Sequence, residues 1–215
     1  MFIFYVLWMI VCPFLTIFCP TKIVGKKYLK VTKNNPTIFT CNHQSNFDPV
    51  ILKCRVDTRF RIMAKDSLFR TKFKNWFFTK VVGAYPVARG EGDLQSIKTT
   101  LKLLKQDNHL LIFPEGTRNL DGVMSEFKTG VVMFALKTDA YVVPSAFQKR
   151  PKFFRFNKLI IGKPFKFSEM KEFKDCKVDK ETLEKATEIL FNKIKELKDV
   201  DVKEYRKLIR ADFKK

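Results

Sequence analysis

The chain has 215 residues, 46% of them hydrophobic and 14% aromatic, which excludes a disordered polymer and suits one domain with a sizeable core. Its formal net charge of +20 at pH 7 favours an anionic partner, such as nucleic acid, acidic lipid headgroups or an acidic carrier protein. The five cysteines form no CxxC pair, so neither a disulfide framework nor a zinc site is expected, and a reducing compartment is favoured.

The N-terminal segment is hydrophobic. Residues 2–19 carry no charge, and five lysines follow them: Lys22, Lys26, Lys27, Lys30 and Lys33. A cleaved signal peptide would have basic residues before the apolar run, so we expect residues 1–21 to be a membrane anchor. A full span needs about 20 apolar residues, so the segment either spans the bilayer or lies in it, and a buried core helix is the alternative. The lysines predict that residues 22–215 stay on the cytoplasmic face.

Short apolar runs alternate with helical patterns through the rest of the chain. The apolar residues of the segment 94–106, for example, recur at helical spacing. In chain order we expect a strand at 37–41, a helix that begins at 49–53, a strand at 81–87, a helix at 94–106, a strand at 109–113, a helix at 128–137, a strand at 141–143 and an amphipathic helix at 180–198. This alternation predicts an α/β fold with a mixed, partly parallel sheet surrounded by helices.

The positive charge is unevenly distributed. Residues 22–88 carry 14 basic and 3 acidic side chains, residues 89–148 carry 7 of each, and residues 149–215 carry 21 and 12. Within the first of these segments, residues 59–80 interleave seven basic side chains with six aromatic ones. This stretch is interpreted either as a contact with an anionic membrane surface or as an ordinary core helix with a solvated basic face, and both can hold for opposite faces.

The first candidate site is the segment 42–48, NHQSNFD, which lies between the strand 37–41 and the next helix. A carboxylate at Asp48 that accepts a hydrogen bond from His43 would fix the tautomer of the imidazole and raise the basicity of its other nitrogen. His43 could then remove a proton from a substrate hydroxyl. Ser45 is too close to His43 in the sequence to be an obvious triad serine.

Further polar clusters follow two other expected strands. Residues 113–118 are FPEGTR, which places backbone amides, a hydroxyl and the Arg118 guanidinium on one turn. Guanidinium can bind a phosphate group bidentately. Arg89 in the segment YPVARG and Lys128 in the segment FKTG add two more cations.

Taken together, NHxxxxD, Pro-x-x-Arg, FPEGTR, FKxG and a later Val-Pro resemble the glycerolipid acyltransferases, and among them the lysophosphatidate acyltransferases. The resemblance covers residues 37–147, half of the chain, with every block in order. It implies transfer of an acyl group from acyl-CoA or acyl-ACP to the hydroxyl of lysophosphatidate, forming phosphatidate, without a metal or other cofactor.

By the same resemblance, His43 and Asp48 are the expected catalytic pair. The expected phosphate site comprises Glu115, Gly116, Thr117, Arg118, Arg89 and Lys128, in which Glu115 orients the site and Arg118 binds the phosphate. The resemblance makes residues 22–215 an acyltransferase domain, with a basic helical tail at 180–215. The expected partners are the lysophospholipid acceptor, the acyl donor and an anionic membrane surface, and no nucleic acid.

The chain departs from the family pattern in places. Ala88 stands where many members have Asp, the segment 68–80 lacks the usual Pro and Gly, and the anchor is short for a family that often uses two helices. Glycerol 3-phosphate or another lysophospholipid is the alternative acceptor. The alternatives to an enzyme are a basic lipid-binding or scaffold protein of the same fold and a nucleic-acid-binding protein.

Overall fold

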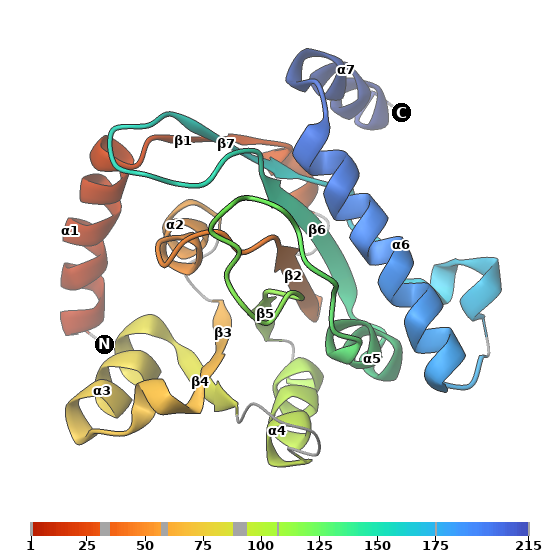
Figure 1. The fold of residues 1–215 in the computed structure, drawn as a ribbon, viewed down its shortest axis with the longest axis horizontal. Helices are drawn as coiled ribbons and strands as arrows, with labels where there is room; N and C mark the ends of the chain where they lie inside the picture. The colour runs from red at the N-terminus through yellow and green to blue at the C-terminus, as the bar shows by residue number, and fades with distance from the viewer. Residues whose placement is uncertain are drawn as a thin grey trace.

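A seven-stranded mixed sheet forms the centre of the computed structural model, which describes residues 2–30, 35–56, 60–87, 94–106, 108–174 and 176–214 (Figure 1). All strand pairs are parallel except β6 with β7. In sheet order, the strands are β1 (Thr21–Val24), β7 (Asn157–Ile161), β6 (Tyr141–Phe147), β2 (Thr37–Cys41), β5 (His109–Ile112), β3 (Arg61–Lys65) and β4 (Ala84–Val87). The prediction of a mixed sheet flanked by helices is confirmed.

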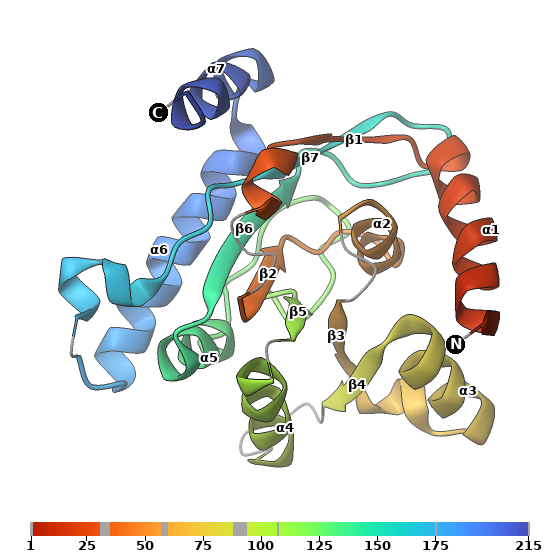
Figure 2. The same ribbon diagram turned by 180° about the vertical axis from the view of Figure 1, so that it is seen from behind.

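Helices surround this sheet (Figure 2). Their bounds are α1 (Phe2–Phe18), α2 (Asp48–Arg55), α3 (Lys72–Trp76), α4 (Leu94–Lys105), α5 (Gly130–Thr138), α6 (Lys180–Asp199) and α7 (Val202–Asp212). A π-helical segment, η3 (Phe77–Val82), follows α3, and 3-10 turns occur at η1 (Lys26–Lys30), η2 (Asp66–Phe69), η4 (Phe167–Glu169) and η5 (Lys171–Phe173).

The central strands are buried on both faces because they are parallel strands covered by helices. Every residue of β2 and β5 is buried, which explains why their sequences, TIFTC and HLLI, are almost continuously apolar. The long helix α6 packs against β6 and β7. Its buried residues are Ala186, Leu190, Ile194 and Leu197, so the predicted amphipathic tail helix is confirmed as part of the fold.

The tail is also held by α7. Tyr205, buried on this helix, donates a hydrogen bond from its hydroxyl to the Ile161 carbonyl at 2.9 Å. The Tyr28 hydroxyl donates to Asp212 at 2.6 Å, and burial followed by this hydrogen bond raises the pKa of Tyr28 above its ordinary value. The C-terminal helix is therefore bonded to segments from the start of the chain and from β7.

The prediction of a strand at 81–87 is wrong at its start. Val81 and Val82 belong to η3, and the strand begins only at Ala84. The two elements are separated by Gly83, whose φ is +72° and whose Cβ, if present, would lie 2.6 Å from Lys53 Nζ. That buried ammonium donates to the carbonyl oxygens of Val82 at 2.5 Å and Phe60 at 2.9 Å, which fixes the end of the π-helical segment.

The interpretation of residues 59–80 as one core helix is also wrong. The described part of this stretch, from residue 60, contains β3, η2, α3 and most of η3. Phe60 is buried, whereas Phe73 and Trp76 are exposed. The aromatic residues of this stretch therefore lie in two different environments, the core and the surface.

The N-terminal helix α1 packs against α2, with Leu15 buried and with Met9, Phe14 and Ile17 exposed. None of the helices in the described ranges is both long enough and apolar enough to cross a membrane.

Candidate active site

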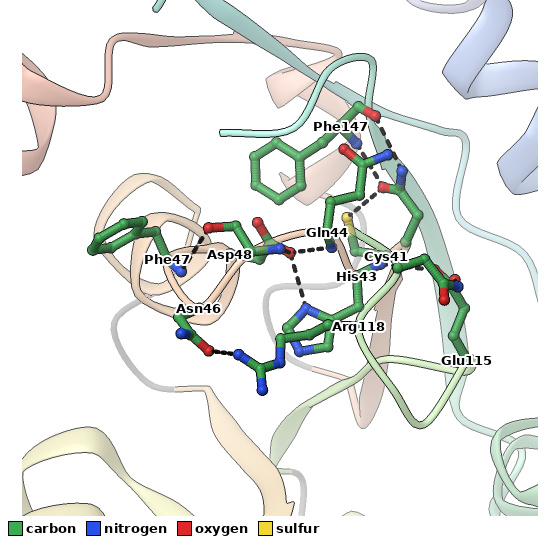
Figure 3. A network of polar contacts seen from close by, with 12 residues as sticks. Cys41, His43, Gln44, Asn46, Phe47, Asp48, Glu115, Arg118 and Phe147 are labelled. Atoms are coloured by element: carbon green, nitrogen blue, oxygen red, sulfur yellow. Dashed lines mark hydrogen bonds and ion pairs between the residues drawn. The ribbon is translucent and has the colours of Figure 1, made fainter. Parts of the chain in front are cut away.

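The link between β2 and α2 places His43 beside Asp48. The Asp48 side chain is fully buried, and its Oδ2 accepts hydrogen bonds from His43 Nδ1 at 2.9 Å and from the backbone N–H groups of Gln44 at 2.6 Å and Ser45 at 2.7 Å (Figure 3). Pro49 at the start of α2 suits a helix N-terminus, where its missing N–H is not needed. The carboxylate therefore orients the imidazole through Nδ1 and leaves Nε2 available to a substrate.

The next strand of the sheet fixes the plane of the imidazole. Strands β2 and β5 pair with Thr40 opposite Ile112, so the residues that follow them emerge side by side. The rings of His43 and Phe113 stack with their centroids 4.0 Å apart and their planes at 19°. On the other side of β2, the Asn42 side chain accepts from the Phe147 N–H at 2.8 Å and donates to its carbonyl at 3.1 Å. The loop that carries His43 is thus held from both neighbouring strands.

Glu115 joins the two motif segments. Its carboxylate is buried, and Oε1 accepts from the His43 backbone N–H at 2.7 Å. Oε2 accepts from the Ser125 N–H at 3.1 Å, from the Ser125 hydroxyl at 3.3 Å and from the Asn119 side-chain amide. In return, the Asn119 backbone N–H donates to the His43 carbonyl at 2.9 Å. This geometry suits the expected orienting role of Glu115, because its oxygens are occupied by the protein.

Gly116 and Arg118 lie on the turn that follows β5, and the backbone N–H of Lys128 donates to the Pro114 carbonyl of this turn at 2.9 Å. The Arg118 guanidinium is exposed and donates to the Asn46 side-chain oxygen (Figure 3). Gly116 has a φ of +68°, and a Cβ at this position would lie 3.0 Å from Lys128 Cε. The positive φ therefore favours glycine here, and a larger residue would also displace the Lys128 side chain slightly.

These residues line one cavity of about 910 Å³, together with His43. The remaining walls are mostly apolar and come from α1, α2, β3, η2, η3, β4, α4 and α5, with Lys65, Ser67 and Ser96 among the few polar side chains. They include Val11, Ile62, Met63, Ala64, Leu68, Phe77, Phe78, Val81, Val82, Val87, Ile97, Val131 and Phe134. The cavity therefore combines a cationic rim and an imidazole with an apolar interior, which suits an amphipathic substrate.

The structure brings together most of the candidate residues predicted from the sequence. His43, Gly116, Arg118 and Lys128 line the cavity, and Asp48 and Glu115 support it from behind. Thr117 is exposed and lies outside the cavity lining. Arg89 lies outside the described residues. Within those residues, no group of three or more His, Cys, Asp or Glu side chains is placed to hold a metal ion.

Several residues that support the site were not predicted from the sequence. Asn46 lies within NHQSNFD but was not singled out, and its contact with Arg118 depends on a residue 72 positions away. Asn119 and Ser125 contact Glu115 only because the loop after β5 folds back on itself. No local signal in the sequence identifies these contacts.

The end of the central strand β2 thus carries an imidazole, oriented by a carboxylate, that lines a largely apolar cavity. The family model described as "Acyltransferase" matches residues 21–148. The chain is also 34% identical over 168 residues to the 1-acyl-sn-glycerol-3-phosphate acyltransferase of Bacillus subtilis (strain 168), a match covering 75% of this chain and 81% of that protein. The chain therefore belongs to the acyltransferase family, and it is an enzyme of that class.

Two further comparisons agree with this assignment. The chloroplastic 1-acyl-sn-glycerol-3-phosphate acyltransferase LPAT1 of Arabidopsis thaliana is 30% identical over 115 residues, covering 53% of this chain and 32% of that protein. The crystal structure of the 1-acyl-sn-glycerophosphate acyltransferase from Thermotoga maritima has the same fold, with a TM-score of 0.66 at 22% identity. This alignment covers 90% of this chain and 80% of that one.

Proposed function

We propose that this acyltransferase moves a fatty acyl group from an acyl thioester, acyl-CoA or acyl-ACP, to the free hydroxyl of lysophosphatidate and so forms phosphatidate. The observation that carries the proposal is one cavity whose lining combines His43, Arg118 and Lys128 with mostly apolar side chains. The relatives described above are named for this acceptor, which supports the same choice here.

In the proposed reaction, His43 Nε2 removes the proton of the acceptor hydroxyl while its oxygen attacks the thioester carbonyl. Asp48 stabilises the imidazolium that forms, because its Oδ2 is bonded to Nδ1 at 2.9 Å. Collapse of the tetrahedral intermediate breaks the carbon–sulfur bond, and the proton held by His43 passes to the leaving thiolate. No protein nucleophile and no metal or other cofactor is required by this sequence of steps.

Arg118 and Lys128 are proposed to bind the acceptor phosphate, and the apolar part of the cavity to hold an acyl chain. A phosphate monoester carries two negative charges, which suits two cations that line one cavity. An acyl chain would bury its methylene groups against Phe77, Val81 and Phe134. Glu115, Gly116 and Thr117 would contribute through the shape of the turn, and Arg89 remains a proposed member of the phosphate site on sequence grounds.

We also propose that the enzyme works on the cytoplasmic face of a membrane, where its acceptor and product reside. The exposed apolar side chains of α1, and those of Phe73 and Trp76 on α3, support this proposal together with the net charge of +20. The hydrophobic segment 1–21 would then hold the acyltransferase domain at the surface.

The decisive test is an acyl-transfer assay on the purified protein in anionic vesicles. Lysophosphatidate, glycerol 3-phosphate and a lysophospholipid without a phosphate monoester are offered in turn, each with acyl-CoA and with acyl-ACP. We expect phosphatidate to be the main product, no detectable product with His43→Ala, and a raised acceptor KM with Arg118→Gln. Preferred use of another acceptor would overturn the choice of lysophosphatidate, and full turnover by His43→Ala would overturn the mechanism. If no acceptor is used, the lipid-binding alternative is favoured.

A further inference from the structure

The loop between β6 and β7 exposes three phenylalanines. Phe153, Phe154 and Phe156 are 46%, 77% and 55% exposed, although they lie within four residues of one another. We call residues 150–156 the phenylalanine loop. Single exposed apolar residues are ordinary on protein surfaces, but a cluster of large aromatic side chains on one short loop marks a surface that another apolar phase covers.

The loop holds its most exposed ring in an unfavourable backbone conformation. Phe154 has a φ of 57°, in the left-handed region that bulky side chains rarely adopt. Its N–H donates to the Phe18 carbonyl at the end of α1 at 2.6 Å, and the two rings meet edge to face at 5.3 Å. Strained conformations persist where the surrounding structure imposes them, often at functional sites. The contact with α1 is what holds the Phe154 ring outward.

The base of the loop is fixed by further contacts. The Asn157 side chain is buried, donates to the Lys149 carbonyl at 2.5 Å and accepts from the Lys149 N–H at 3.2 Å. Phe153 packs edge to face on Phe47, next to the catalytic candidate Asp48, with ring centroids 5.0 Å apart. The phenylalanine loop is thus a defined projection and is joined to both α1 and the loop that carries the proposed catalytic pair.

The charge of this region favours an anionic partner. Residues 149–158 carry five basic side chains and no acidic one: Lys149, Arg150, Lys152, Arg155 and Lys158. Figures 1 and 2 show the loop reaching across to the end of α1, on the side of the molecule away from α6 and α7. The exposed Phe14 of α1 adjoins the loop through Phe18, whose ring centroid lies 4.3 Å from that of Phe14 and 5.3 Å from that of Phe154. Aromatic rings between cations suit the boundary between acyl chains and anionic headgroups.

We propose that the phenylalanine loop inserts into an anionic lipid bilayer and forms, with the exposed face of α1, one membrane-docking surface. A nucleic acid is disfavoured because the apolar side chains of α1 adjoin the loop and would remain uncovered on a polyanion. The inference rests on the proposed function only in placing the enzyme at a membrane. It is independent of which acceptor is used and of whether His43 is catalytic.

The first experiment places a single tryptophan in the full chain, with Trp8 and Trp76 both changed to Phe. Phe154→Trp is compared with Leu208→Trp, a matched control at a 60% exposed position on α7. Vesicles of phosphatidylcholine and phosphatidylglycerol with brominated acyl chains are added without acyl donor. We expect a blue shift and quenching for Phe154→Trp alone. Equal quenching at both positions, or none at position 154, would overturn the proposal.

The second experiment measures vesicle partitioning of Phe154→Asn against Leu208→Asn. Asparagine tolerates the left-handed conformation, so the loop is expected to keep its shape and the thermal unfolding midpoint to stay unchanged. Partitioning should fall about tenfold for Phe154→Asn and little for the control, because one aromatic side chain no longer leaves water. Unchanged partitioning of a folded Phe154→Asn protein would contradict the docking role. Quenching of the position-154 tryptophan by short DNA but not by lipid would favour a nucleic acid instead.

These measurements separate the inference from the proposed function. If the protein binds vesicles through position 154 but transfers no acyl group, the proposed reaction is contradicted and the docking surface is not. If the protein forms phosphatidate while the side chain at position 154 stays in water, the docking surface is contradicted and the proposed reaction is not.

Discussion

The side-chain carboxylate of Asp48 accepts all of its hydrogen bonds from the described residues at one oxygen. Oδ2 accepts from His43 and from two backbone amides, whereas the buried Oδ1 has no hydrogen-bond partner among the described residues. Through this one oxygen, the carboxylate positions both the imidazole and the β2–α2 turn. A substitution that keeps this oxygen but removes the charge can therefore separate the electrostatic role of Asp48 from its positioning role.

We expect Asp48→Asn to fold and yet to lose most of its turnover. The amide oxygen can take the place of Oδ2 and accept the same three hydrogen bonds, but it cannot stabilise an imidazolium. Loss of effective general-base catalysis should lower kcat by about 10²–10⁴-fold. The measurement is kcat at saturating acceptor, with a cooperative thermal transition as the control. A variant with wild-type kcat would leave Asp48 with a purely structural role.

At the scale of elements, the cavity depends on where η3 ends and α4 begins. The π-helical segment η3 ends just before β4, and its Val81 and Val82 line the cavity together with Ile97 of α4. Replacing a side chain on α4 should change the volume available to an acyl chain without touching His43 or Arg118.

Ile97→Trp is expected to shift the donor preference toward shorter acyl chains. Ile97 is half-buried on α4, so the larger indole can extend into the cavity instead of displacing fully buried neighbours. The measurement is kcat/KM across a series of acyl donors of increasing length, and Ile97→Val is the matched control. An equal loss for all chain lengths would indicate that the acyl chain lies elsewhere.

The helix α7 supplies a pH-dependent contribution to stability. Asp201 caps its N-terminus by accepting from the N–H groups of Lys203 at 2.8 Å and Glu204 at 3.0 Å. Hydrogen bonds from the Glu204 and Lys203 backbones hold the pKa of the Asp201 carboxyl below its ordinary value. A depressed folded-state pKa stabilises the protein above the unfolded-state pKa, and this contribution is lost as the pH falls through the folded-state pKa.

Asp201→Asn should therefore remove part of the acid sensitivity of the fold. Asparagine keeps a capping oxygen but carries no charge to titrate. We expect the thermal midpoints of wild type and variant to differ more near neutral pH than in acid. Parallel midpoint curves over the whole acidic range would show that the charge of this cap makes no contribution.

The whole molecule has two basic segments on either side of a neutral one. Residues 89–148, which contain FPEGTR, have no net charge, whereas residues 22–88 and 149–215 together carry all of the excess. The phenylalanine loop lies in the C-terminal basic segment, and the exposed Phe73 and Trp76 lie in the first. Long-range attraction to an anionic surface therefore does not come from the segment that contains the FPEGTR turn.

Binding to anionic vesicles should weaken with salt without disappearing. Raising the salt from about 0.1 M to about 1 M shortens the Debye length from about 10 Å to about 3 Å, which screens the cations but leaves apolar contacts in place. The measurement is the fraction of protein that sediments with vesicles, and neutral vesicles provide the control. Binding that is insensitive to salt would contradict an electrostatic contribution.

The sequence by itself determined the order of the strands β2, β5 and β6 and of the helices α2, α4, α5 and α6, because their apolar periodicity is local. It also determined the proximity of His43 and Asp48, since five residues at a strand–helix junction allow few arrangements. It did not reveal β1, β3 or β7, and it extended the strand at 81–87 over the end of η3. Short strands have little periodicity of their own.

Only the tertiary structure decided which of the candidate residues meet. The pairing of β2 with β5 brings His43 to FPEGTR across 72 positions of sequence, and Glu115 then turns inward to bond the His43 backbone. The phenylalanine loop, which precedes β7, contacts the end of α1, which precedes β1, because β1 pairs with β7. Contacts between distant segments depend on sheet pairing and on the burial of shared surface, and neither is encoded in any single stretch of the chain.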